Sequence, residues 1–219
     1  MSAPSETSAR QDIVRVGRML AQCGLVAGTD GNLSVRLDAE RILITPSGLA
    51  KGRLQPEDMV IVDHQGAHID GAAKPSSEMA MHLFIYRQRP EMAACVHAHP
   101  PHATAFAVAG AELPEDILPE VAVFVGRIPL TEYAPPGTEA VPNSLAPFVD
   151  DCNAFLLRNH GVMTIGQTLE QAYNRLETVE QYAKILYLAR TLGDIGHIPP
   201  ADLQRLRELR HTLQTATGN

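Results

Sequence analysis

The chain has 219 residues, of which 45% are hydrophobic and 20% are charged, and its formal net charge is −7 at pH 7. A chain of this length buries about 70% of its unfolded surface as one domain, so we expect a single domain over residues 1–219. The charge is negative and forms no long block of one sign, which argues against a nucleic-acid-binding surface and a nucleic-acid partner.

The cysteines and the N-terminal segment indicate a reducing compartment. Cys23, Cys95 and Cys152 are isolated and odd in number, so they predict no disulfide framework. Residues 1–12 are polar and lack the apolar core of a signal peptide, and no apolar run reaches membrane length. We therefore expect a soluble, cytoplasmic protein with no membrane partner.

The first third of the chain is expected to contain one helix and several short strands. Apolar residues recur at helical spacing from Ile13 to Cys23 and stop at Gly24, and residues 1–10 are expected to be disordered or helical. A turn at 64–66 joins two strands of a hairpin. The predicted strands cover residues 32–36, 41–45, 59–63 and 67–70.

The middle of the chain is expected to alternate between helices and strands. Ser76 or Ser77 is a favourable N-cap for a helix that ends before Pro90. A second, shorter helix over 101–109 is closed by Gly110. Apolar runs predict strands over 93–96, 121–125 and 155–157, and residues 134–137 predict a loop.

Two helices are expected to close the chain. Thr168 and Gln171 form a capping box for a long helix that ends near Gly193. A charged amphipathic segment predicts a final helix over about 201–213. Strands interspersed with about five helices favour a mixed sheet with helices on its faces.

Three histidines form the pattern most informative about function. His97 and His99 follow a predicted strand, where side chains two residues apart share one face, and His160 follows the apolar run 155–157. Three imidazoles on neighbouring strand ends predict one metal ion with open coordination positions, as a catalytic zinc site requires. A His-x-His pair alone is more often a core or edge decoration. Cys95 shares the face of the pair, and we assign it to the core.

Small polar residues beside the strands form candidate anion sites. The loops 28–34 and 45–48 offer backbone N–H groups and hydroxyls, although such loops alone are usually only turns. Ser76 and Ser77 at a helix N-terminus favour phosphate more strongly, the alternative being a plain serine cap followed by Glu78.

Together these blocks resemble the class II aldolase and adducin head family over about residues 14–191. The resemblance implies a three-layer α/β/α fold with a mostly antiparallel central sheet, and a homotetramer with sites at subunit interfaces. The blocks are Gly28-Thr-Asp-Gly-Asn-Leu-Ser34, Ile44-Thr-Pro-Ser-Gly48, Pro75-Ser-Ser-Glu78, His97-Ala-His99, Tyr133-Ala-Pro-Pro-Gly-Thr138 and Asn159-His-Gly161.

The resemblance also implies roles for individual residues. His97, His99 and His160 resemble the ligands of a divalent zinc, with manganese or cobalt as alternatives. Glu78 resembles the glutamate that caps the free metal and then serves as acid and base. The positions that resemble the family's phosphate-binding residues are Thr29, Asn32, Ser47, Gly48, Ser76 and Ser77.

The implied activity is that of a zinc-dependent aldolase. It would cleave a phosphorylated ketose reversibly to dihydroxyacetone phosphate and an aldehyde through a metal-stabilised enediolate. The alternatives on this scaffold are a pentulose-phosphate 4-epimerase, a methylthioribulose-1-phosphate dehydratase and a sugar-acid phosphate decarboxylase. Epimerases carry aspartate after the paired serines, so Glu78 favours the aldolase. A metal-free module like the adducin head is disfavoured because all three histidines are present.

The chain departs from the family's aldolases on the aldehyde side. Residues 117–120 lack the tyrosine, contributed across the subunit interface, that protonates the leaving aldehyde oxygen, and residues 207–219 contain no aromatic residue. Water, Glu120 or Tyr133 are the alternatives for the missing proton donor. His82, four residues after Glu78, is expected to be a packed helix histidine rather than a residue behind the site.

Overall fold

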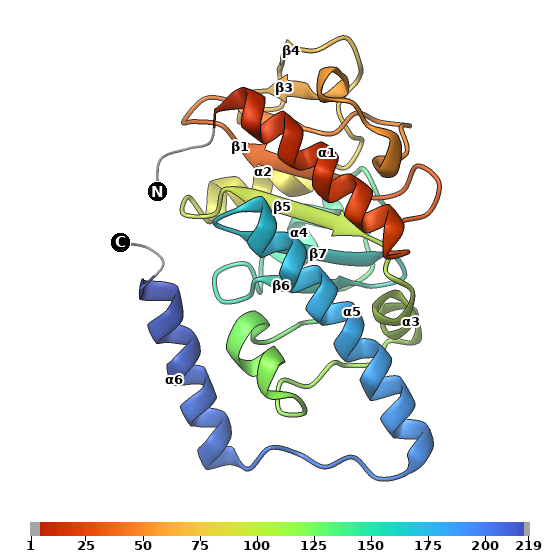
Figure 1. The fold of residues 1–219 in the computed structure, drawn as a ribbon, viewed down its shortest axis with the longest axis vertical. Coiled ribbons are helices and arrows are strands. Elements are labelled where there is room, and N and C mark those ends of the chain that lie inside the picture. The colour runs from red at the N-terminus through yellow and green to blue at the C-terminus, as the bar shows by residue number, and fades with distance from the viewer. Residues whose placement is uncertain (1–4, 217–219) are drawn as a thin grey trace.

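The computed structural model describes residues 5–216, and its centre is a seven-stranded sheet in the order β4-β3-β2-β1-β5-β7-β6 (Figure 1). Every neighbouring pair of strands in this sheet is antiparallel, in agreement with the expected sheet type. The strands are β1 (Asn32–Arg36), β2 (Ile42–Ile44), β3 (Val60–Val62), β4 (His68–Asp70), β5 (Ala94–Ala98), β6 (Ala154–Leu157) and β7 (Gly161–Gly166).

Helices cover both faces of the sheet, because successive strand residues point to opposite sides. On β1, Leu33 and Val35 join one buried apolar cluster with α1 (Glu6–Gln22) and α5 (Leu169–Leu192), the two helices in front of the sheet in Figure 1. The opposite face packs against α2 (Met79–Gln88). The fold is therefore the expected three-layer α/β/α arrangement.

The remaining elements lie around this sandwich. They are the helices α3 (Pro101–Ala109), α4 (Ala140–Leu145) and α6 (Pro200–Ala216), the 3₁₀ turns η1 (Lys51–Arg53) and η2 (Pro56–Asp58), and the π-helix η3 (Val121–Val125). In Figure 1, α6 lies away from the sheet and packs beside η3. Of the helices in residues 5–216, none has both the length and the apolar character that crossing a membrane requires.

The prediction of a strand over 121–125 is wrong. The segment is a single π-helical turn, closed by the Gly126 N–H, which donates to the Val121 carbonyl oxygen at 2.7 Å. All of its residues except Phe124 are buried. A short apolar run that is buried nearly all round has no periodicity to distinguish a strand from a helix, so sequence alone could not decide.

The expected start of the second helix is also wrong. Glu78, not Ser76 or Ser77, occupies the N-cap position of α2. The Ser76 N–H donates to the Thr45 carbonyl oxygen at 3.1 Å, so this segment is extended and pairs with the chain after β2. Ser76 and Ser77 therefore precede the helix, and Ser77 lies in the turn that leads into it. Helix α4 and strand β7 are further elements without a sequence prediction.

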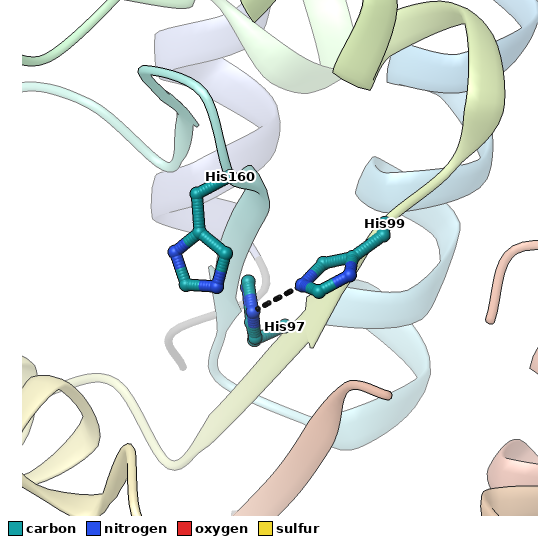
Figure 2. A group of neighbouring side chains, drawn as sticks. All are labelled: His97, His99 and His160. Carbon is teal, nitrogen blue, oxygen red and sulfur yellow. Dashed lines mark hydrogen bonds between the residues drawn. The ribbon is translucent and has the colours of Figure 1, made fainter. Parts of the chain in front are cut away.

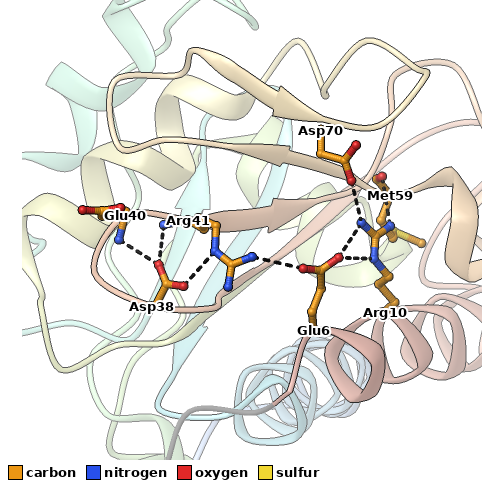
Figure 3. A network of polar contacts seen from close by, with 7 residues as sticks. All are labelled: Glu6, Arg10, Asp38, Glu40, Arg41, Met59 and Asp70. Carbon is orange, nitrogen blue, oxygen red and sulfur yellow. Dashed lines mark hydrogen bonds and ion pairs between the residues drawn. The ribbon is translucent and has the colours of Figure 1, made fainter.

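The N-terminal helix begins earlier than the apolar spacing indicates. Ser5 caps α1, with its side chain accepting from the Ser8 N–H. A polar network (Figure 3) ties this end of the helix to the sheet, because Arg41 pairs with Glu6 at 3.1 Å and Arg10 pairs with Asp70 at 3.6 Å. Of the residues 1–10 expected to be disordered or helical, residues 1–4 lie outside the described part.

Candidate active site

Three imidazoles converge at one end of the central strands (Figure 2). His97 is within β5, His99 lies just beyond it, and His160 lies in the turn between β6 and β7. The ring centroids are 4.7–5.0 Å apart, and one nitrogen from each ring lies within 4.8 Å of the others. The predicted triad is therefore assembled in space from two segments distant in sequence.

The turn that carries His160 depends on its neighbours. Asn159 has a φ of 56°, a left-handed conformation that asparagine tolerates better than most residues. A Cβ on Gly161 would lie 2.5 Å from His99 Cδ2 and 2.6 Å from the Ala98 carbonyl oxygen. Only glycine therefore allows the turn to bring His160 against the end of β5.

The Glu78 carboxylate reaches the same point from the start of α2. Its Oε2 lies 3.2 Å from His97 Nε2, and its Oε1 lies 3.1 Å from His160 Nε2. Burial alone would raise the pKa of Glu78, but attraction to His97 and hydrogen bonds from His160 and His97 outweigh burial and hold the pKa well below its usual range. Glu78 is therefore a carboxylate at neutral pH.

The histidines are oriented for metal binding. His97 Nδ1 lies 2.9 Å from the Val162 carbonyl oxygen and His99 Nδ1 lies 3.5 Å from Asp30 Oδ2, so both Nδ1 atoms face acceptors. When a metal replaces the protons between the rings and Glu78, a proton on each Nδ1 leaves each Nε2 as its ligand. Burial, followed by the nearby imidazoles of His97 and His160, lowers the pKa of His99 to about 4 and keeps it neutral.

The donor set fits a tetrahedral zinc ion. Zinc–nitrogen bonds of about 2.0–2.1 Å put two tetrahedral ligand nitrogens about 3.3 Å apart. His97 Nε2 and His99 Nε2 are 3.1 Å apart and face each other. Glu78 Oε1 is buried and lies 3.1 Å from His160 Nε2, so a carboxylate oxygen stands beside the imidazole nitrogens. The residues present therefore fit the predicted metal.

The predicted phosphate-binding segments come together beside this centre. The Ser47 N–H donates to the Lys74 carbonyl oxygen at 2.9 Å, which joins the loop after β2 to the segment before α2. Ser47, Gly48 and Ser77 are exposed, whereas Ser76 is buried. Two of the predicted segments thus lie side by side, with Ser47, Gly48 and Ser77 at the surface, whereas the Ser47 and Ser76 N–H groups donate to carbonyl oxygens of the protein.

The remaining two predicted phosphate residues differ in their surroundings. Thr29 is exposed in the loop before β1. The side chain of Asn32 is buried, and its Nδ2 donates to Glu78 Oε2 at 2.8 Å while its Oδ1 contacts His82 Nε2. Asn32 therefore supports Glu78 in this structure, and its contact with phosphate stays a prediction.

Three residues at the site were not assigned a role from sequence. Lys51 is buried beneath the loops, although it resembles an ordinary loop lysine in sequence. Asp30 lies beside His99, within the loop already predicted to bind an anion. His82 is packed in α2 as expected, and its hydrogen bond to Asn32 also places it behind Glu78. In the sequence, this role is indicated only by the position of His82 four residues after Glu78.

The two residues considered for the missing proton donor lie in different surroundings. Glu120 lines a groove of about 630 Å³ along α5 together with Glu177 and Tyr182. Tyr133 is 58% exposed. The loop that follows Tyr133 packs against Ser77, because a Cβ on Gly137 would lie 3.3 Å from the Ser77 carbonyl oxygen.

Comparisons with known proteins agree with this geometry. Residues 11–187 match the model of the Class II Aldolase and Adducin N-terminal domain. The 3-oxo-tetronate 4-phosphate decarboxylase of Escherichia coli strain K12 is 33% identical over 94% of this chain and 98% of its own. The L-fuculose phosphate aldolase of Methanococcus vannielii is 37% identical over 81% of this chain and 95% of its own.

Solved structures give the same result. An L-fuculose 1-phosphate aldolase structure has 34% identity and a TM-score of 0.84, and the match covers 92% of this chain and 95% of that one. The family model spans most of the chain, and both relatives are matched over nearly their whole length. This chain therefore belongs to the class II aldolase and adducin N-terminal domain family.

Proposed function

We propose that this protein is a metal-dependent carbon–carbon lyase that cleaves a phosphorylated ketose reversibly to dihydroxyacetone phosphate and an aldehyde. One observation carries the proposal. The Glu78 carboxylate lies 3.1–3.2 Å from two of three converging imidazoles. A carboxylate at a metal site, beside groups able to hold phosphate, is the arrangement that enediolate chemistry needs.

His97, His99 and His160 would hold the metal, for which zinc is the first choice and manganese or cobalt are alternatives. When bound, the ion supplies Lewis-acid stabilisation of the charge that develops on the substrate oxygens. The rigid ends of β5 and β6 fix the three rings before substrate binds, and such preorganisation lowers the cost of reaching the transition state.

Glu78 would transfer the proton at carbon. In the direction of aldol addition, its carboxylate removes a proton from the carbon beside the carbonyl group of dihydroxyacetone phosphate, and the electron pair of that bond forms the enediolate. In cleavage, the hydroxyl of the carbon that becomes the aldehyde gives its proton to the site. The carbon–carbon bond breaks, its electron pair stays on the three-carbon half, and Glu78 delivers a proton to that carbon.

The substrate phosphate would bind the hydroxyl and N–H groups beside the metal centre. The residues proposed for it are Thr29, Asn32, Ser47, Gly48, Ser76 and Ser77. A phosphate held there would fix the reacting carbons relative to Glu78. We also propose, from the family resemblance, a cytoplasmic homotetramer in which a neighbouring subunit completes the aldehyde side of each site.

Decarboxylation of a sugar-acid phosphate is the second candidate. The Escherichia coli relative named as a decarboxylase matches almost the whole chain, and residues 117–120 lack the tyrosine that would exchange a proton with the aldehyde oxygen. Loss of carbon dioxide from a 3-oxo acid leaves an enediolate and forms no aldehyde, so it needs no group to exchange that proton. Glu78 would then protonate the same carbon as in the aldolase reaction.

One measurement tests the step that both candidates share. Zinc-loaded protein should exchange a carbon-bound proton of dihydroxyacetone phosphate with deuterated water, and NMR detects the loss of that signal. Release of dihydroxyacetone phosphate from a phosphorylated ketose then identifies the aldolase, and release of carbon dioxide from a 3-oxo-sugar-acid phosphate identifies the decarboxylase. Absence of exchange together with interconversion of L-ribulose and D-xylulose 5-phosphates would replace both with an epimerase.

A further inference from the structure

A chain of buried polar side chains leads from the Glu78 carboxylate into the core between β1 and α2. Asn32 Nδ2 donates to Glu78 Oε2 at 2.8 Å, and Asn32 Oδ1 contacts His82 Nε2. His82 Nδ1 lies 2.7 Å from Ser34 Oγ, which lies 2.7 Å from the Tyr86 hydroxyl. The four residues that form this hydrogen-bonded chain with Glu78 are at most 3% exposed; they are Asn32, Ser34, His82 and Tyr86.

Two regular spacings in the sequence, one of four residues and one of two, bring the members of this hydrogen-bonded chain together. Glu78, His82 and Tyr86 are spaced by four residues, so they share one face of the α2 region. Asn32 and Ser34 are spaced by two, so they share one face of β1. That face looks toward α2, because the intervening Leu33 belongs to the opposite core.

The hydrogen bonds of this chain have only one consistent direction. A carboxylate only accepts, so Asn32 must turn its NH₂ group to Glu78 and its carbonyl oxygen to His82. His82 Nε2 must then carry the ring proton, and His82 Nδ1 accepts from the Ser34 hydroxyl. Ser34 in turn accepts from Tyr86. The whole chain therefore points its donors toward Glu78.

The orientation of the Asn32 amide depends on His82. If the amide rotated by half a turn, its oxygen would face the Glu78 carboxylate and its NH₂ would face the His82 N–H. Both contacts would be repulsive, and each would leave buried polar groups without a hydrogen-bond partner, which is unfavourable. Burial also lowers the pKa of His82 to about 3, so the ring stays neutral and keeps a single donor on Nε2.

We propose that His82 is a positioning residue that, through Asn32, fixes the rotamer of the Glu78 carboxylate for proton transfer. The proposal rests on the proposed function of Glu78 as acid and base. Asn32 Nδ2 and His97 Nε2 both contact Glu78 Oε2, at 2.8 Å and 3.2 Å, whereas Oε1 lies beside His160. A carboxylate anchored at one oxygen presents its other oxygen in one direction, and satisfied buried networks are rigid. His82 itself exchanges no proton with the substrate.

The experiment compares two replacements of His82 in the zinc-loaded protein. His82→Gln keeps an N–H donor that can reach Asn32, whereas His82→Met removes the donor and keeps a similar volume. We expect His82→Met to lower the rate of proton exchange on dihydroxyacetone phosphate by about 10–100-fold, the usual cost of removing an outer partner of a metal site. His82→Gln should recover most of that rate, and neither variant should change the KM for dihydroxyacetone phosphate.

Controls separate positioning from folding. Tyr86→Phe removes the hydroxyl that begins the chain, and Tyr182→Phe removes a buried hydroxyl of α5 that donates to the Pro114 carbonyl oxygen at 2.6 Å. Tyr86→Phe should slow exchange measurably, whereas Tyr182→Phe should leave exchange unchanged. Zinc content and the thermal unfolding midpoint are measured for every variant, so that metal loss and unfolding are identified directly.

The outcomes distinguish the inference from the function on which it rests. Nitrogen-15 NMR of the wild-type protein should find His82 as the neutral tautomer protonated on Nε2. A proton on Nδ1, or equal exchange rates in zinc-loaded His82→Met and wild-type protein, overturns the inference and leaves the proposed function standing. If the wild-type protein itself catalyses no exchange, the proposed function fails and the inference fails with it.

Discussion

The ammonium group of Lys51 donates to the carbonyl oxygen of Thr29 at 2.7 Å and to that of Leu49 at the same distance. It therefore joins the loop before β1 to the loop after β2, the two loops that carry Thr29, Ser47 and Gly48. Lys51 is held there by α1, because a Cβ on Gly17 would collide with the Lys51 carbonyl oxygen at 2.5 Å. A cation is thus fixed beneath a surface proposed to bind phosphate.

Lys51→Met should weaken anion binding. A unit positive charge about 10 Å from a unit negative charge attracts it with an energy of about 1.5 kcal/mol at an effective dielectric constant of about 20. Loss of the Lys51 charge should therefore lower the affinity for the anion by about tenfold. The probe is inorganic sulfate, measured by calorimetry, because its charge does not change between neutral and alkaline pH. Lys74→Met is the control, since Lys74 is exposed beside Ser76. Equal losses in both variants would contradict a specific role for Lys51.

The same lysine should make anion binding depend on pH. Burial lowers the pKa of Lys51 to about 8, although Asp30 and Glu78 oppose the shift. The positive charge is present below this pKa and is lost above it, so sulfate affinity of the wild-type protein should fall as the pH rises through about 8. Lys51→Met should show a flatter profile. An unchanged wild-type affinity from pH 7 to pH 9 would show that this charge does not reach the anion.

Glu78→Gln should keep the fold and the metal but lose about 10²–10⁴ in turnover, the usual contribution of a positioned acid or base. Proton exchange on dihydroxyacetone phosphate measures the loss directly. Glu170→Gln is the control, because Glu170 is an exposed carboxylate paired with Arg15 on the surface. Exchange that persists at the wild-type rate in zinc-loaded Glu78→Gln would assign the proton transfer to another group.

Protein purified without chelator should contain about one divalent ion per subunit, most simply zinc, in a site with three protein ligands. The double variant His97→Ala, His99→Ala should lose it, as measured by elemental analysis. His102→Ala should keep it, because His102 Nδ1 pairs with Glu180 at 2.7 Å and lies outside the triad. Stoichiometric metal in the double variant would place the ion elsewhere.

Replacing Ser76 and Ser77 with Ala should raise the KM for a phosphorylated substrate. A hydrogen bond to a charged group contributes about 1.5–3 kcal/mol, so we expect about a tenfold rise or more. Ser8→Ala on the exposed surface of α1 serves as the control. Equal activity of the parent protein on the sugar without phosphate would argue against a phosphate site.

The metal-free protein should lose stability as the pH falls below about 6.5. Burial lowers the pKa of His82 from 6.5 to about 3, so between these values the unfolded chain binds a proton that the folded chain excludes. This group alone contributes a slope of up to about 1.4 kcal/mol per pH unit. Urea unfolding at pH 7, 6 and 5 measures the slope, and His82→Gln should have a shallower slope than the wild-type protein.

Local spacing was enough to predict several parts of the site. The His97-Ala-His99 pair, the Asn159-His-Gly161 turn and the helical interval between Glu78 and His82 each define a geometry within a few residues. The positions of α1, α3 and α5 followed in the same way, because caps and periodicity act within single elements.

How these local units meet depends on strand register and packing between distant parts of the chain. The antiparallel register of β1 and β5 places Asn32 opposite His97, which brings the Asn32 amide to Glu78 and assigns it a direction. Packing of α1 on η1 turns Lys51 from a loop lysine into a buried cation. Packing around residues 121–125 likewise selects a π-helical turn over a strand. These features depend on contacts between residues far apart in the chain, and no local pattern contains that information.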